Sequence, residues 1–156
     1  MKKTFTVSEA LEKMRHYCAY QERCHKDVKD KLYSMRMIPQ VIEQVMGTLV
    51  NEGYLNESRF AQQFAHGKFS IKHWGKLRIT RELKFRKVSA YDIKLALKKI
   101  DDATYLKKIN EISEKKWEQL SRHSTQIRKQ KLFQYLAYRG WETHLIYEQL
   151  DRLTAS

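Results

Sequence analysis

The segment KHWGKLRITREL, which spans Lys72–Leu83, combines the residue types most suited to binding an anion. Helical spacing of about 100° per residue turns Ile79 and Leu83 inward and places a row of cations on the opposite face. Guanidinium and ammonium groups recognise phosphate and carboxylate oxygens, and several cations on one face raise the local potential. The side chains that we expect to contact such a partner are Lys72, Lys76, Arg78, Arg81, Lys84 and Lys87.

The surplus positive charge of the chain is concentrated around this segment. The 156 residues include 31 Lys and Arg against 18 Asp and Glu, a formal net charge of +13 at pH 7. Residues 68–99 hold eleven basic and two acidic side chains, residues 8–56 seven of each sign, and residues 102–153 ten basic and seven acidic. A charged helix face is often merely solvated, but this concentration favours a polyanion partner, either nucleic acid or a nucleoprotein.

The large side chains beside the cations have two interpretations each. For Leu77 and Phe85 we favour packing against a neighbouring helix over contact with a partner. Trp74 is either a platform for base stacking or a lid over the start of the helix, and the adjacent Gly75 favours the lid because glycine permits close packing of the chain.

No pattern in the sequence indicates catalysis. The five glycines are too scattered for a phosphate-binding loop, and the six histidines form no HExxH pair. Cys18, Cys24 and His25 lack the spacing of a structural zinc site. We therefore expect no enzymatic activity, metal or cofactor, although a Ser–His–Asp triad assembled by the fold from distant positions stays open at this point.

These side chains are carried by a helical pattern that occurs three times along the chain. Six large apolar positions in the first third reappear 51 residues later and again 53 residues after that. The positions are Val28, Leu32, Met37, Ile42, Met46 and Leu49; then Ile79, Leu83, Val88, Ile93, Leu97 and Ile100; then Leu132, Leu136, Trp141, Ile146, Leu150 and Leu153. In each copy the first two predict one helix, a short break precedes the third, and the last three predict a closing helix.

A further apolar helix precedes each of these pairs, and residues suited to helix ends stand between the predicted helices. The apolar residues of the upstream helices are Ala10, Leu11, Met14 and Cys18; Phe60 and Phe64; and Leu106, Ile109 and Ile112. The capping residues that we expect for them are Ser8, Asn56 and Asp102, with Ser89 and Thr143 near the starts of closing helices. Pro39 suits a first helical turn, and Gly53 and Gly140 suit left-handed helix ends.

The sequence therefore predicts an all-α protein of three tandem three-helix units: residues 8–56, 57–101 and 102–153. So small a trio buries too little apolar surface to be stable alone, and we expect an elongated array of units, straight or curved. Five Gly and one Pro leave little material for the turns of an all-β or βαβ fold. The chain lacks an apolar run of about 20 residues, a signal-peptide core and a disulfide framework, which favours a cytoplasmic protein that binds no membrane.

The junction NEGYLNESRFAQQFA, residues 51–65, resembles a motif of the RecX regulatory proteins, which modulate the RecA recombinase. In that family Gly, two hydrophobic residues and Asp or Asn precede Arg-Phe-Ala between the first and second units. A second motif is matched by Trp74, Gly75, Ile79, Glu82 and Leu83, and the turn YRGWE around Gly140 matches a third. The likeness runs from about Ser8 to Leu153. The family often has Gly four residues after the second Leu of each repeat, where this chain has Arg36, Lys87 and Gly140.

The resemblance implies a non-enzymatic regulator of DNA repair and recombination. Members of the family bind the RecA filament on single-stranded DNA, lie along its groove and generally inhibit strand exchange, ATP turnover and co-protease activity. Some also bind DNA directly. The expected partners are therefore the RecA filament and single-stranded DNA, with duplex DNA left open, and we expect the chain to act as a monomer. The alternative is a helical DNA-binding protein, architectural or regulatory, that acts without RecA.

Overall fold

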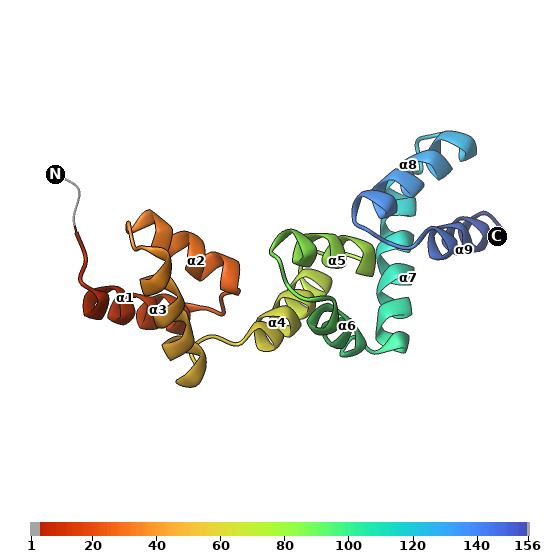
Figure 1. Cartoon of the computed structure of the whole chain (residues 1–156). Coiled ribbons are helices and arrows are strands. Elements are labelled where there is room, and N and C mark those ends of the chain that lie inside the picture. The colour runs from red at the N-terminus through yellow and green to blue at the C-terminus, as the bar shows by residue number, and fades with distance from the viewer. Residues whose placement is uncertain (1–3, 156) are drawn as a thin grey trace. The chain divides into compact units, whose positions relative to one another are not determined.

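The computed structural model describes residues 4–155, which form nine α-helices and no strand (Figure 1). The helices are α1 Val7–Tyr20, α2 His25–Ser34, α3 Pro39–Asn51, α4 Glu57–Ser70, α5 Lys76–Phe85, α6 Ala90–Lys98, α7 Asp102–Gln119, α8 Thr125–Tyr138 and α9 Thr143–Thr154. The predicted all-α class and its helical repeat are confirmed. None of the helices in this described range is long and apolar enough to cross a bilayer.

The repeat inferred from the apolar positions forms the core of the protein. Fifteen of the eighteen positions are buried, and the other three, Met37, Leu97 and Leu153, are half-buried. One upstream position was predicted wrongly, because Leu106 is 44% exposed whereas its neighbour Tyr105 is only 3% exposed. Adjacent apolar residues on a helix lie about 100° apart, and spacing alone assigned the inward position to the wrong one of the two.

Of the three residues predicted to cap the upstream helices, Asn56 does so, whereas Ser8 and Asp102 do not. Thr143 is the first residue of α9 rather than its cap. The Oδ1 of Asn56 accepts from the N–H of Arg59 at 2.9 Å, and Ser89 caps α6 in the same way. However, α1 is capped by Thr6 rather than Ser8, since Thr6 and Glu9 exchange hydrogen bonds of 3.0 Å in a capping box. The cap of α7 is Asp101 rather than Asp102, and Pro39 occupies the first turn of α3 as predicted.

The breaks in the three repeats adopt the same turn geometry. The residue four positions after the second Leu is left-handed in every copy, with φ of 63° at Arg36, 63° at Lys87 and 84° at Gly140. In each copy the N–H of the next residue donates to the carbonyl of that Leu at 3.1 Å, as from Trp141 to Leu136. This is a Schellman motif, and its hydrophobic contact explains why a large apolar residue stands after the break. Gly53, with φ of 79°, ends α3 in the left-handed conformation as predicted.

The chain folds into two compact units. One comprises residues 4–64 together with 83–96, and the other comprises 65–82 together with 97–155. In the first unit α1 and α2 pack on α3 around a buried cluster that includes Met14, Leu32 and Leu49. In the second, α7, α8 and α9 pack on one another. The boundaries at 8–56, 57–101 and 102–153, and the elongated array, stay predictions.

Candidate nucleic-acid interface

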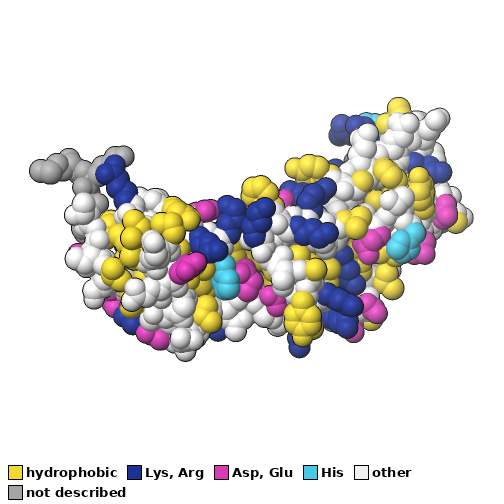
Figure 2. Space-filling view, viewed as in Figure 1, with side chains coloured by type: hydrophobic (Ala, Val, Ile, Leu, Met, Phe, Trp, Pro, Cys, Tyr) yellow, Lys and Arg dark blue, Asp and Glu magenta, His cyan; other side chains and the backbone are white. Residues whose placement is uncertain are grey.

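Four of the six predicted contact residues are exposed. Arg81 and Lys84 lie on α5, Lys72 precedes this helix, and Lys87 is the left-handed residue that follows it. Figure 2 shows Lys and Arg side chains gathered over α5, with hydrophobic side chains among them. Arg81 and Lys84 are one turn apart on the helix, so their charges project from neighbouring positions on the same face. We call Lys72, Arg81, Lys84 and Lys87 the exposed cations of the α5 segment.

The other two predicted contact residues are engaged within the protein. The Nζ of Lys76 lies 3.9 Å from the carboxylate of Asp102 and 4.6 Å from the centroid of the Tyr105 ring. The guanidinium of Arg78 lies between two rings, 4.1 Å from the centroid of Trp74 and 4.8 Å from that of Tyr138.

Arg78 also acts as a cap for a helix of the third trio. Its Nη1 donates to the backbone carbonyl of Tyr138 at 3.2 Å, at the last residue of α8. A cation is favourable there because the C-terminal end of a helix carries partial negative charge. Trp74, predicted to be a lid or a stacking platform, supports this guanidinium with one ring face. Arg78 is therefore part of the structure that holds α5 to α8.

The start of α5 and the turn after α8 are joined by backbone hydrogen bonds. The N–H of Gly75 donates to the carbonyl of Arg139 at 2.8 Å, and the N–H of Leu77 donates to that of Gly140 at 3.0 Å. The first N–H groups of a helix lack partners within the helix, so the turn satisfies donors that would otherwise need water or a cap. We call this contact the α5–α8 joint.

Two glycines make the α5–α8 joint possible. A Cβ on Gly75 would lie 2.5 Å from the carbonyl oxygen of Gly140, and a Cβ on Gly140 would lie 2.2 Å from the Cβ of Arg78. Both distances are below any normal contact, and Gly140 also has φ of 84°. These positions therefore require glycine because two backbones meet there.

A cluster of aromatic side chains packs next to the α5–α8 joint. Trp141 is buried, as predicted for a core position, and its ring stacks on Tyr105 with centroids 4.5 Å apart. The indole N–H of Trp141 donates to the carbonyl of His73 at 3.0 Å. The hydroxyl of Tyr105 accepts from the N–H of Lys76 and donates to the carboxylate of Glu142. Burial, and then the Glu142 carboxylate, raise the pKa of Tyr105, so the hydroxyl stays protonated as this donor role requires.

The apolar side chains that flank the cations are exposed, which corrects the packing expected for them. Leu77 is 53% exposed and Phe85 is 71% exposed. Both positions lie on the face of α5 opposite to Ile79 and Leu83, and none of the described helices covers them. Two exposed apolar side chains therefore accompany the exposed cations on this face of α5.

The cysteines perform a structural function. Both thiols are buried, and the Sγ of Cys24 caps α2 by accepting from the N–H of Asp27 at 3.4 Å. Burial raises the pKa of Cys24 to about 12, so the thiol is neutral at ordinary pH. Nowhere in residues 4–155 do three His, Cys, Asp or Glu side chains gather as a metal site would require.

Comparison with known proteins identifies relatives of one kind. Residues 56–97 match the family model of the second three-helix domain of RecX, and residues 103–150 match that of the third. The chain is 24% identical over 145 residues to a protein of Clostridioides difficile named "Regulatory protein RecX", covering 93% of this chain and 68% of that one. A protein of the same name from Oceanobacillus iheyensis is also 24% identical, over 94% of this chain and 55% of its own length. The chain thus spans between about half and two thirds of these relatives.

Solved structures with a similar fold are RecX proteins as well. The crystal structure of RecX from Lactobacillus salivarius superposes with a TM-score of 0.84 at 21% sequence identity, covering 96% of this chain and 97% of that one. A second crystal structure of a regulatory protein RecX has the same TM-score at 19% identity, covering 94% of this chain and 73% of its own. At such identities the likeness establishes the helical fold.

Proposed function

Because the chain belongs to the RecX family, we propose that it is a non-enzymatic regulator that binds the RecA filament on single-stranded DNA and inhibits it. The inhibited activities would be strand exchange, ATP hydrolysis and co-protease activity in DNA repair and recombination. The observation that carries the proposal is the set of exposed cations of the α5 segment within a helical repeat array. Such a regulator would act in the cytoplasm, where two buried unpaired cysteines are stable.

The charge of the α5 segment supports an anionic partner. Arg81, Lys84, Lys72 and Lys87 are exposed to solvent, and two exposed apolar side chains accompany them on α5. Cations of this kind bind the phosphates of DNA or the carboxylates of an acidic protein surface. A repeat protein that touches successive subunits of a filament would gain affinity from several weak contacts at once.

The test of this proposal is the single-stranded-DNA-dependent ATP hydrolysis of the cognate RecA, measured with and without the protein. We expect the hydrolysis rate to fall as the protein is added, with a smaller effect from a variant that lacks Arg81 and Lys84. A rate that stays unchanged at saturating protein would contradict the proposal. Pull-down of the protein with preformed filaments, compared with RecA alone and DNA alone, would show which component is recognised.

The alternative is a DNA-binding protein that acts without RecA. The exposed basic helix α5 within a helical repeat favours it, because such a helix can be presented to a duplex. A sequence-selective factor would discriminate among duplexes of equal length, whereas a filament regulator would prefer the nucleoprotein over naked DNA of any sequence. Competition between duplexes and preformed filaments therefore separates the two functions.

A further inference from the structure

A second basic surface lies in the third trio, in a groove between α7 and α8. The groove has a volume of about 370 Å³, and a smaller pocket of about 170 Å³ adjoins it through the shared side chains of Lys116 and Tyr135. The residues that line the groove are Lys116, Leu120, His123, Lys131, Gln134, Tyr135, Tyr138 and Arg139. We call this surface the α7–α8 groove.

The charge of the α7–α8 groove is of one sign. Lys116, Lys131 and Arg139 line it, Lys115 lines the adjoining pocket, and no Asp or Glu is among the described residues that line either. Three of the four carboxylates of α7 are paired elsewhere: Glu114 binds Arg152 at 2.8 Å, Asp102 lies 3.9 Å from Lys76 and Glu111 lies 4.0 Å from Lys107. At about 100° per residue, Glu111, Glu114 and the fourth carboxylate, Glu118, project on the side of α7 away from Lys116.

Two tyrosines accompany the cations. The Tyr135 ring has the Lys116 ammonium 5.0 Å and the Arg139 guanidinium 3.8 Å from its centroid. Tyr138 is 70% exposed, and Arg78 of the α5–α8 joint holds it with a guanidinium 4.8 Å from the ring centroid. Stacking on an aromatic ring beside a cationic track is how proteins bind single strands without reading their sequence.

The adjoining pocket is also lined by a histidine. His73 lines this pocket, and its buried Nδ1 has no hydrogen-bond partner within residues 4–155. Burial, followed by the charges of Lys108 and Arg139, lowers the pKa of His73, so the imidazole is neutral and can accept as well as donate. The neutral His73 therefore adds no charge to the pocket, and its buried Nδ1 is not a contact for a bound strand.

We propose that the α7–α8 groove binds single-stranded nucleic acid, with phosphates at Lys116 and Lys131 and a base stacked on Tyr138. An acidic protein segment would also be attracted by the charge, but it has no base to stack on the exposed Tyr138 ring. The proposal does not rest on the recombinase, because the groove would bind naked strands. It extends the proposed function by adding a nucleic-acid contact in the third trio. The net charge of residues 102–153 is smaller than that of residues 68–99 and did not by itself indicate such a contact.

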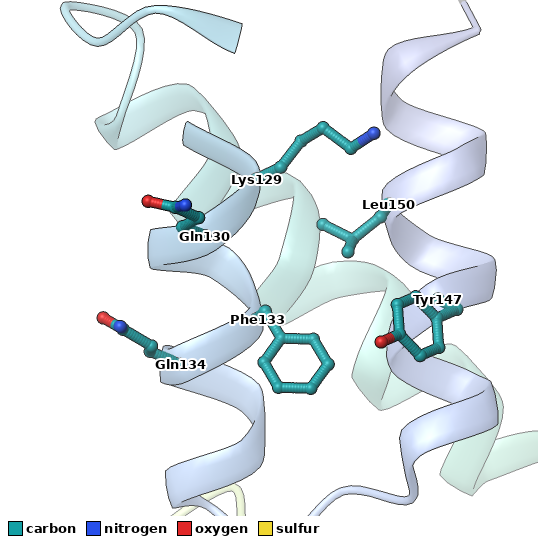
Figure 3. A pocket seen from close by; sticks show the side chains of 6 residues that line it. All are labelled: Lys129, Gln130, Phe133, Gln134, Tyr147 and Leu150. Carbon is teal, nitrogen blue, oxygen red and sulfur yellow. The ribbon is translucent and has the colours of Figure 1, made fainter. Parts of the chain in front are cut away.

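The groove on the other side of α8 provides a matched control. Figure 3 shows this groove between α8 and α9, where the Phe133 and Tyr147 rings face one another across it. Their centroids are 5.6 Å apart, and Lys129 is the cation among the described side chains that line it. Lys129 and Lys107 lie on α8 and α7, like Lys131 and Lys116, but outside the α7–α8 groove.

The experiment measures binding of a short fluorescein-labelled oligothymidylate to the full chain by fluorescence anisotropy, without recombinase, over a range of salt concentrations. The variant Lys116→Gln/Lys131→Gln should weaken binding about tenfold or more at low salt and flatten the log–log salt slope by about 1.4, roughly 0.7 per phosphate. The control Lys107→Gln/Lys129→Gln removes the same charge and should change the affinity less than about twofold. Tyr138→Ser should weaken binding by about fivefold or more through lost stacking, whereas Tyr138→Phe should bind like the unsubstituted protein.

The contrary outcomes are equally distinct. Absence of binding to the oligothymidylate, or equal losses from the groove pair and the control pair, overturns the proposal. Binding to fluorescein-labelled polyglutamate is measured in parallel. If the groove pair lowers polyglutamate and DNA affinity alike while Tyr138→Ser changes neither, the groove is a site for acidic protein and the proposal is wrong. Because the recombinase is absent, this result is separate from the ATP hydrolysis test.

Discussion

Arg78 and Arg81 lie one turn apart on α5, yet their surroundings differ. The Arg78 guanidinium is held between the rings of Trp74 and Tyr138 and donates to the last carbonyl of α8. Arg81 is exposed to solvent, as is Lys84 on the next turn. The same contrast separates Lys76, which is engaged by Asp102 and Tyr105, from the exposed Lys84.

The difference follows from where the third trio attaches. The N–H groups at the start of α5 donate to carbonyls of the turn after α8, so the first turn of α5 lies against another helix end. The cations in that turn, Lys76 and Arg78, contact rings and oxygen atoms of the third trio. Arg81 and Lys84, which come later in α5, are exposed to solvent. A cluster of like charges on one helix can therefore contain both structural and exposed members.

The largest effect is expected from adding a methyl group at the α5–α8 joint. Gly140→Ala places a Cβ 2.2 Å from the Cβ of Arg78 and forces an L residue to keep φ of 84°. Left-handed strain and overpacking together should cost about 3 kcal/mol of unfolding free energy. Gly53→Ala is the control, since Gly53 has φ of 79° but a Cβ there meets nothing within 4 Å. Its cost should be about 1 kcal/mol. Equal losses in urea unfolding would show that the joint does not contribute to stability.

The parts of this arrangement that sequence could predict are those that depend on periodicity. The apolar spacing predicts the helices and the core positions, because burial of one face imposes the same period wherever a helix packs. The left-handed turns were visible at Gly53 and Gly140, but Arg36 and Lys87 adopt the same φ without the glycine that signals it. All three copies share the Schellman geometry, and the large apolar residue that follows each break in the repeat is the sequence feature that indicates it.

The division of the cations could not be predicted, because it depends on residues far away in the chain. Arg78 contacts Tyr138, 60 residues later, and nothing within α5 distinguishes it from Arg81. The signals that could have pointed to the joint are Gly75 and Gly140, whose backbones meet. Tyr135 and Tyr138 of the α7–α8 groove were missed because residues 102–153 have a smaller charge surplus, ten basic against seven acidic, than residues 68–99, and only the fold brings basic side chains of α7 and α8 together beside these rings.

Removing the engaged arginine should affect stability more than removing the exposed one. Arg78→Ala loses two cation–π contacts and the hydrogen bond to the end of α8, which should cost about 1–2 kcal/mol of unfolding free energy. Arg81→Ala removes an exposed side chain and should change stability by less than about 0.5 kcal/mol. Thermal or urea unfolding monitored by circular dichroism checks both. If Arg81→Ala proved as destabilising as Arg78→Ala, the assignment of structural and exposed cations on α5 would be wrong.

Removing the exposed cations should instead weaken binding to filaments. Arg81→Ala/Lys84→Ala should lower affinity for RecA filaments and, where the contacts are to single-stranded phosphate, flatten the log–log salt slope by about 0.7 per contact. The variant Lys29→Ala/Arg36→Ala removes the same charge from the first trio and should have little effect, because that trio is balanced in sign. Equal affinity and slope for both variants would eliminate α5 as the contact surface. Unfolding curves that coincide with that of the unsubstituted protein are required of both.

The smallest effect is expected at the two left-handed residues that are not glycine. Arg36→Gly and Lys87→Gly each relieve φ of 63° at an L residue, which should stabilise the fold by about 0.5 kcal/mol after the greater freedom of glycine in the unfolded chain is subtracted. The two variants should therefore unfold at similarly raised urea concentrations. They should differ in function, because Lys87 belongs to the exposed cations of the α5 segment whereas Arg36 follows α2 in the balanced first trio. Of the two variants, only Lys87→Gly should lower the affinity for filaments, and a salt titration of filament binding measures this. Equal binding by both variants would remove Lys87 from the contact surface and confine it to Lys72, Arg81 and Lys84.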